Sequence, residues 1–298
     1  MDLYSPTCCK AGYKCKKYSE WFSQCIKNDK IVKKPITFWV LGDSTLSEFI
    51  DSEGNGSYYY KKYGYGTQLH NYFDDNVTIQ NLAFSGASSK SFLELPNYQT
   101  FLEGIKSGDY LTFGFGHNDE KREEARFTDP NGDYKTKGSF ANSLYENYIK
   151  IAMERNATVI LTTPIVRRTD DPNWTSSKLH ITTDKDGYPG GDYPQAIRDL
   201  GKELNIPVID MTVITKDLYD SFGVENTLNL HAWKNSDPSS VDNTHLNSWG
   251  SKYIAYIFTR MIKKDNIAGL GDRVLEAEVP IMEECLVINP DYVEPTTN

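Results

Sequence analysis

Short apolar runs alternate with longer segments of helical periodicity between residues 36 and 264 of the chain. Such runs are typical of buried parallel strands, and the longer segments are typical of helices that cover a sheet. The predicted strands span residues 36–41, 77–83, 109–116, 157–164 and 206–211. The predicted helices span residues 139–156, 192–205, 212–222 and 248–264.

This alternation predicts an α/β fold, a doubly wound, flavodoxin-like parallel sheet of about five strands flanked by helices. Ligands bind such sheets beyond the carboxyl ends of the strands. Two polar stretches, residues 119–137 and 167–191, are longer than ordinary connections, and we expect them to form walls over that edge. We therefore assign residues 36–266 to the main domain and residues 267–298 to a C-terminal extension.

Four short sequences carry the candidate chemistry. They are GDST at 42–45, SG at 85–86, GHND at 116–119 and DNTH at 242–245. Together they supply an acyl-transfer site, with Ser44 as nucleophile, His245 as its base and Asp242 as the group that orients the base. The backbone N–H groups of Ser44 and Gly86, with the side-chain amide of Asn118, would form the oxyanion hole. This chemistry requires no metal and no cofactor.

Each of the four sequences has another explanation when it is taken alone. An Asp-Ser pair after a strand often caps a helix, a single glycine often makes a turn, and GHND also fits an Asx-turn. Their joint position, at strand ends or just before a helix, favours the catalytic interpretation. We expect Ser44 to lie at a helix N-terminus, and Asp242 and His245 to share one turn.

Cysteines crowd into the first 25 residues, where Cys8, Cys9, Cys15 and Cys25 lie, and only Cys285 lies elsewhere. This density indicates either disulfides or a metal site, and the absence of His and of a CxxC pair favours disulfides. We therefore expect a secreted, extracellular protein, although the first ten residues lack the apolar stretch of a signal peptide. Sequons for N-glycosylation at Asn55, Asn76, Asn156 and Asn173 are compatible with that route.

The amino-acid composition limits the classes of molecule that the protein is expected to bind. The net charge of −9 argues against nucleic acid, which is bound through basic patches. No run approaches the roughly 18 apolar residues that span a bilayer, so no membrane partner is expected. The 20 tyrosines, 13 phenylalanines and five tryptophans fit a protein that stacks against sugars, although aromatic residues also fill cores.

The segment TCCKAGYKCKKYSEWFSQC (residues 7–25) resembles the C-terminal half of a fungal family-one carbohydrate-binding module. The resemblance implies that residues 1–26 bind cellulose, with Trp21 and Phe22 stacked on glucose rings and Gln24 bonded to sugar hydroxyls. Alternatively, the two aromatic rings fill the interior of the small knot. The N-terminal half of the module is missing, and residues 27–35 form a short linker without Ser/Thr/Pro-rich composition.

The four catalytic sequences together resemble the SGNH hydrolases, and within them the rhamnogalacturonan acetylesterases. The resemblance covers roughly residues 36–265 and includes SGDYLTFGFGHND (107–119), VILTTPIVRR (159–168), GDYPQAIRDLGKELNIPVIDMT (191–212) and VDNTHLN (241–247). It implies an esterase that removes acetyl groups from plant cell-wall polysaccharide, most of all rhamnogalacturonan, through an acyl-enzyme. The family commonly has Arg-Ser after the oxyanion glycine, and this chain has Ala87-Ser88, which puts the substrate rather than the chemistry in doubt.

Other functions remain open at this level. They are an acetylxylan esterase, an acyl-lipid hydrolase and a non-catalytic protein that binds glycans. Near the predicted site, sugar contact and packing explain His117 and Asp119 equally well, whereas Asp43 fits a structural acceptor. His180 and His231 are weaker candidates for lining a substrate groove, and no spacing of histidines suggests a metal site.

Overall fold

Two units make up the chain in the computed structural model, Met1–Pro35 and Ile36–Asn298. The structure describes residues 9, 13–27, 33–51 and 54–294. Most of the expected linker, residues 28–32, and the last four residues of the expected extension lie outside this range.

A parallel sheet of five strands forms the centre of the larger unit. The strands are β3 (Ile36–Gly42), β4 (Val77–Asn81), β5 (Tyr110–Gly114), β6 (Thr158–Thr162) and β7 (Val208–Ile209). Their order in the sheet is β4-β3-β5-β6-β7, and every neighbouring pair is parallel. The predicted flavodoxin-like sheet is therefore confirmed; four of its strands end two residues earlier than the apolar runs, and β3 ends one residue later.

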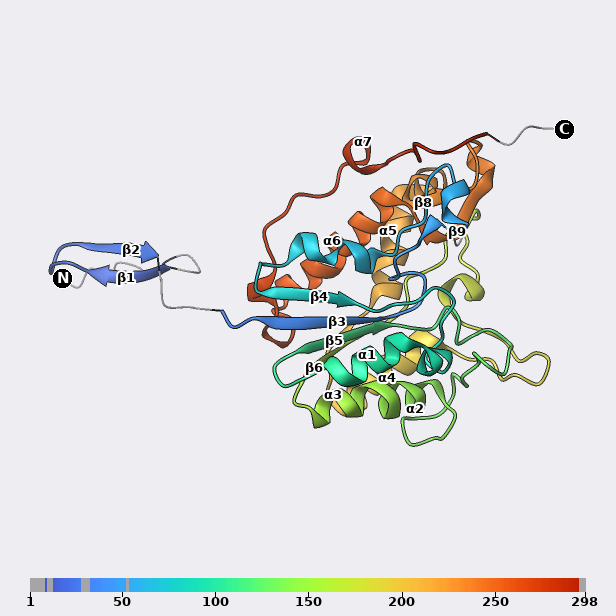
Figure 1. Cartoon of the computed structure of the whole chain (residues 1–298), viewed down its shortest axis with the longest axis horizontal. Helices are drawn as coiled ribbons and strands as arrows, with labels where there is room; N and C mark the ends of the chain where they lie inside the picture. Colours follow the sequence, from blue (N-terminus) through green and yellow to red (C-terminus); the bar gives the residue numbers. More distant parts are fainter. Residues whose placement is uncertain (1–8, 10–12, 28–32, 52–53, 295–298) are drawn as a thin grey trace. The chain divides into compact units, whose positions relative to one another are not determined.

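Helices cover both faces of this sheet (Figure 1). One face carries α1 (Pro96–Gly104), α2 (Phe140–Leu144), a π-helical turn (Tyr145–Ile149), α3 (Lys150–Glu154) and α4 (Tyr193–Leu204). The other face carries α5 (Met211–Asn226) and α6 (Ser248–Lys264). Asp192, Asp210 and Asn247 cap α4, α5 and α6 respectively, each accepting from a backbone N–H of the first turn.

Strand β3 shows how the sequence builds both cores. Successive side chains of a strand point to opposite faces. Phe38 and Val40 are buried against α6, whereas Trp39 and Leu41 are buried with the aromatic cluster under α1 and α2. Because β3 is apolar at consecutive positions, both of its faces are covered, and its carboxyl end is the only part free to carry polar side chains.

The N-terminal unit is a hairpin of β1 (Tyr13–Lys17) and β2 (Ser23–Lys27). A disulfide joins Cys9 to Cys25, whereas Cys15 is a free, exposed thiol. Cys15 lies opposite Cys25 in the hairpin, but the sulfur of Cys25 is already bonded to Cys9. Among the described residues, the expected disulfide-rich knot therefore contains one disulfide. Cys8 lies outside the described residues.

Residues 267–294 pack onto the larger unit. The indole of Trp249 donates to the carbonyl of Pro280, and Asn289 donates to the carbonyls of Gly56 and Tyr58. The sequon asparagine Asn55 is buried, and its amide bonds both backbone groups of Lys62, so this sequon is not available for glycosylation in the folded protein. Within the described ranges, every helix is too short or too polar to cross a membrane.

Candidate active site

Ser44 lies in a single tight turn after β3. Its start requires glycine, because a Cβ atom at Gly42 would lie 2.5 Å from the carbonyl oxygen of Gly114 in β5. The expected helix does not form. The chain makes one turn, closed by the N–H of Ser47 bonding the carbonyl of Asp43, and the carbonyls that would continue a helix bond the N–H groups of Gly64 and Tyr65 instead.

The structure brings the predicted triad together. Nε2 of His245 lies 3.0 Å from Oγ of Ser44, and Nδ1 of His245 lies 2.7 Å from Oδ2 of Asp242. The first contact joins residues 201 positions apart in the sequence. This is the arrangement in which an imidazole accepts a proton from a hydroxyl while a carboxylate fixes its tautomer.

Asp242 is held as a carboxylate. Burial opposes its ionisation, but the hydrogen bond to His245, the charge of an imidazolium and the N–H groups of Thr244 and His245 outweigh burial and lower its pKa. The phenol of Tyr58 lies against this carboxylate, and burial together with the negative charge raises the pKa of Tyr58 to about 12. Tyr58 therefore stays neutral beside the triad.

Asp242 and His245 both lie in the strand β9 (Val241–Leu246). This strand pairs irregularly with β8 (His231–Trp233). Residues three apart in a regular strand face opposite sides. Here Oδ1 of Asp242 accepts from the N–H groups of Thr244 and His245, and this local turn brings the carboxylate and the imidazole together.

His231 supports this turn from behind. Its Nδ1 lies 2.9 Å from the carbonyl of Asp242 and 3.0 Å from that of His245, so Nδ1 carries the proton and donates. Its Nε2 then accepts from the hydroxyl of Tyr219 in α5, at 2.8 Å. His231 is fully buried, so it does not line a groove as the sequence suggested; burial lowers its pKa to about 4.

The predicted oxyanion donors Gly86 and Asn118 lie in loops that contact each other. Gly86 has a φ of 82°, a left-handed conformation that favours glycine. In the described part of the chain, the N–H groups of Ser44 and Gly86 have no acceptor. Nδ2 of Asn118 donates one hydrogen to the carbonyl of Ala87 at 3.0 Å, which leaves its second hydrogen for an oxyanion.

The buried carboxylate of Asp119 ties the two donor loops together. It accepts from the N–H and hydroxyl of Ser89, from the N–H of Gly116 and from the hydroxyl of Thr128. Burial raises its pKa to about 7, against the lowering effect of these hydrogen bonds. Asp119 is fully buried and therefore holds loops rather than sugar.

Two residues of the site were missed by the sequence analysis. The guanidinium of Arg126 donates to Oδ1 of Asn118 at 3.3 Å and pairs with Glu123. The ring of Phe49 packs edge-on against His245, with centroids 5.4 Å apart. Arg126 belongs to a stretch identified only as a wall, and nothing in the sequence around Phe49 signals a contact with a residue almost 200 positions away.

His117 and His180 are buried packing residues. Their rings lie 4.2 Å apart, and a ring nitrogen of each bonds the carbonyl of Ile165. His180 therefore does not line a groove, contrary to the expectation. Asp43 is also buried, and its Oδ1 accepts from the N–H and hydroxyl of Thr45, as expected of a structural acceptor.

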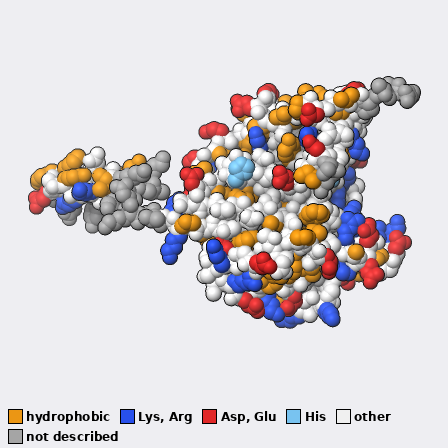
Figure 2. Space-filling model, viewed as in Figure 1, with side chains coloured by type: hydrophobic (Ala, Val, Ile, Leu, Met, Phe, Trp, Pro, Cys, Tyr) orange, Lys and Arg blue, Asp and Glu red, His pale blue; other side chains and the backbone are white. Residues whose placement is uncertain are grey.

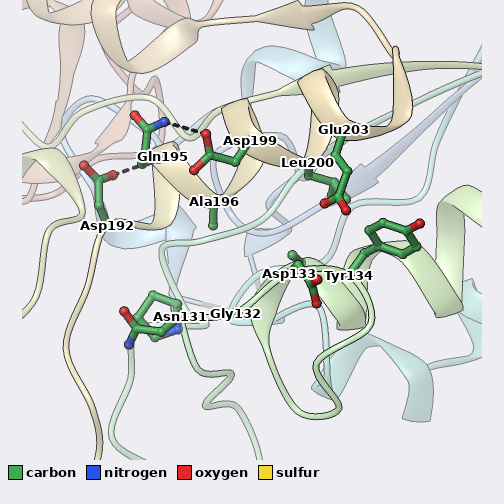
Figure 3. A pocket seen from close by; sticks show the side chains of 12 residues that line it. Asn131, Gly132, Asp133, Tyr134, Asp192, Gln195, Ala196, Asp199, Leu200 and Glu203 are labelled. Carbon is green, nitrogen blue, oxygen red and sulfur yellow. Dashed lines mark hydrogen bonds between the residues drawn. The ribbon is translucent and has the colours of Figure 1, made fainter.

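A separate hollow of about 380 Å³ lies between α4 and residues 130–134 (Figure 3). Its acidic side chains have structural partners: Asp192 caps α4, Asp199 accepts from Gln195, and Asp133 accepts from Thr136. No triad residue lines this hollow. Among the residues described, no group of three His, Cys, Asp or Glu side chains is arranged to hold a metal.

A serine, histidine and aspartate in hydrogen-bond contact at the end of a doubly wound sheet define a serine hydrolase with the SGNH layout. The GDSL-like lipase/acylhydrolase family model matches residues 39–258. The chain belongs to this family, and it is a serine esterase.

Two characterised relatives share most of the chain. It is 33% identical over 240 residues to the rhamnogalacturonan acetylesterase RhgT of Bacillus subtilis, covering 78% of this chain and 92% of the relative. It is 22% identical over 247 residues to a rhamnogalacturonan acetylesterase of Emericella nidulans, covering 78% and 86%.

The crystal structure of YxiM from Bacillus subtilis is also similar. It superposes with a TM-score of 0.58 at 26% identity, covering 83% of this chain and 61% of that chain. The resemblance to SGNH hydrolases is thus confirmed at the level of the family, and the comparisons do not show the fungal binding module. The catalytic roles of the individual residues stay predictions.

We expect Asn118→Ala to lower kcat by about 10²–10³, because one of three oxyanion donors is lost. The measurement is hydrolysis of a small chromogenic acetate, with circular dichroism to verify the fold. Ser44→Ala is the matched control and should abolish turnover, since it removes the nucleophile. Near-wild-type activity of either variant would contradict the assigned site.

We expect His231 to make stability fall on acidification. The unfolded chain binds a proton on this imidazole near the ordinary pKa of 6.5, and the folded chain only near 4, so lowering the pH through this window favours unfolding. The free energy of unfolding in urea, measured at about pH 7 and about pH 4.5, should fall less in His231→Asn than in wild type, by on the order of 3 kcal/mol at most. Equal losses in both proteins would exclude this origin.

Proposed function

We propose that this protein is a carbohydrate esterase that removes O-acetyl groups from plant cell-wall polysaccharide, with rhamnogalacturonan as its main substrate. One observation carries the proposal. The Ser44–His245–Asp242 geometry occurs in a chain that is 33% identical to a rhamnogalacturonan acetylesterase over 92% of that relative.

The mechanism follows from the distances. Neutral His245 takes the proton of Ser44 as Oγ attacks the acetyl carbonyl, and Asp242 stabilises the imidazolium. The N–H groups of Ser44 and Gly86 and the amide of Asn118 bind the oxyanion. His245 then protonates the departing sugar hydroxyl, the acyl-enzyme forms, and water activated by His245 releases acetate and frees Ser44.

The position of Arg126 supports the proposal that the substrate carries a negative charge. Ala87 lacks the charge that the related enzymes commonly carry after the oxyanion glycine. The guanidinium of Arg126 nevertheless lies 3.3 Å from Oδ1 of Asn118 and 3.5 Å from the carbonyl of Gly86. Its partner Glu123 is more than half exposed, so a uronate carboxylate can compete for this cation at little cost.

We expect kcat/KM for acetate release to be about tenfold or more higher on acetylated rhamnogalacturonan than on acetylated xylan, a difference of about 1.4 kcal/mol in transition-state binding. A small chromogenic acetate and a long-chain acyl ester complete the comparison. Preference for xylan would favour the acetylxylan esterase, and preference for the long chain would favour a lipid hydrolase. Absence of hydrolysis on all four would favour a glycan-binding protein.

We also propose that the N-terminal unit binds cellulose through Trp21, Phe22 and Gln24. The alternative, that the aromatic rings fill the interior of the unit, is not supported by their exposure, which is 92% for Trp21 and 56% for Phe22. Figure 2 shows hydrophobic side chains on the surface of this small unit. A polymeric substrate and the Cys9–Cys25 disulfide fit a secreted enzyme, which we include in the proposal.

A cellulose pull-down of the full chain tests this second proposal. Trp21→Ala should bind cellulose about 2- to 10-fold more weakly than wild type, because it removes the most exposed stacking ring. Ser44→Ala should bind as wild type does, since it leaves this unit intact. If Trp21→Ala binds as tightly as wild type, the cellulose role is rejected.

A further inference from the structure

A hollow of about 450 Å³ adjoins the catalytic serine on the β4 side of the sheet. Its lining residues are Glu48, Ile50, Thr67, Asn81, Ala83, Phe84, Ser85 and Asn97. This volume lies within the range of small-molecule sites in proteins. No residue of the triad lines it, and the mechanism above does not use it.

Both walls of the hollow are fixed to the catalytic residues. On one side, Glu48 and Ile50 flank Phe49, whose ring packs against His245. On the other side, the N–H of Phe84 donates to the carbonyl of Gly42, and the N–H of Ala87 donates to the carbonyl of Phe84. The hollow therefore lies between the turn of Ser44 and the loop of Gly86.

The sheet order gives the direction in which a bound polymer would run. Strands β4, β3 and β5 are neighbours, and their carboxyl ends lead to Phe84, Ser44 and Asn118 respectively. The hollow therefore lies beside the strand whose end carries Ser44, on the side of β4. A polymer whose acetyl group reaches Ser44 and whose chain runs toward β4 places its next sugar at the hollow.

The side chains of the hollow match a sugar ring. Phe84 is 40% exposed and Ile50 is 55% exposed, so both present apolar surface to the solvent at the hollow. The C–H face of a pyranose packs against such a surface. The polar side chains of Glu48 and Ser85 also line the hollow and supply groups that bond sugar hydroxyls.

The charge of the hollow selects the kind of sugar. The carboxylate of Glu48 lines this hollow and repels a uronate at this position, whereas the guanidinium of Arg126 bonds Asn118 and the carbonyl of Gly86. We propose that this hollow, with Phe84 as its stacking platform, binds the neutral sugar next to the acetylated residue. The inference rests on the proposed function, because the backbone of rhamnogalacturonan alternates a uronate with rhamnose, a neutral sugar that carries a methyl group.

Binding is tested apart from turnover with the inactive Ser44→Ala enzyme and acetylated rhamnogalacturonan oligosaccharides, by calorimetry. Adding Phe84→Ala should weaken binding about 2- to 10-fold, and Phe84→Tyr should restore it because the flat ring returns. Leu275→Ala, another exposed apolar side chain, is the matched control and should bind as Ser44→Ala alone does.

If Ser44→Ala with and without Phe84→Ala binds the oligosaccharides with equal affinity, the proposed subsite is rejected. The proposed function is unaffected by that result when the wild-type enzyme deacetylates rhamnogalacturonan. Binding that depends on Phe84 for neutral xylan oligosaccharides, in an enzyme inactive on rhamnogalacturonan, keeps the subsite and rejects the proposed substrate. Absence of oligosaccharide binding to Ser44→Ala overturns the subsite as well.

Discussion

The carboxylate of Asp119 receives hydrogen bonds from three segments that would otherwise move independently. Ser89 follows the oxyanion glycine, Gly116 precedes Asn118, and Thr128 belongs to the long polar wall. A carboxyl group in a buried position is costly unless its oxygens are bonded, so these donors must stay in place for the fold to tolerate it. The same bonds link the loop of Gly86 to the loop of Asn118. A buried residue thus supplies the preorganisation that the predicted oxyanion hole requires.

The triad depends on a comparable set of supports. β9 is too short and too irregular to orient two side chains by its pairing alone. His231 donates to the backbone on both sides of the turn, Phe49 packs against the imidazole, and Tyr58 stays neutral beside Asp242. Phe49 and Tyr58 come from the connection after β3, and His231 comes from β8. The geometry of His245 therefore depends on the completed fold rather than on the local DNTH sequence.

The sequence predicted the sheet because the evidence for it is local. Buried strands are continuous apolar runs, and Ser44, Gly86 and Asn118 follow three of them directly. The predictions from sequence were wrong where contacts between residues far apart in the chain determine the local structure. The helix expected after Ser44 is absent because the N–H groups of Gly64 and Tyr65 bond the backbone carbonyls that would continue it. His180 and His231 were expected to line a groove. They are buried instead, because the carbonyl of Ile165 and the hydroxyl of Tyr219 supply their hydrogen-bond partners. Arg126 could not be identified either, since its contact with Asn118 depends on how a loop without periodicity folds.

Chemistry and substrate choice therefore reside in different parts of the molecule. The predicted nucleophile Ser44 and the predicted oxyanion donors Gly86 and Asn118 follow the ends of strands, and their identity can be read from short motifs. The residues proposed to contact the polymer, Arg126 and Phe84, lie in loops. Ala87 illustrates the consequence. A missing arginine beside the oxyanion glycine does not remove positive charge from the site, because a guanidinium from a distant loop lies against the same carbonyl and amide. Substrate preference in this fold must accordingly be judged from the charges and aromatic rings that meet in space around the serine.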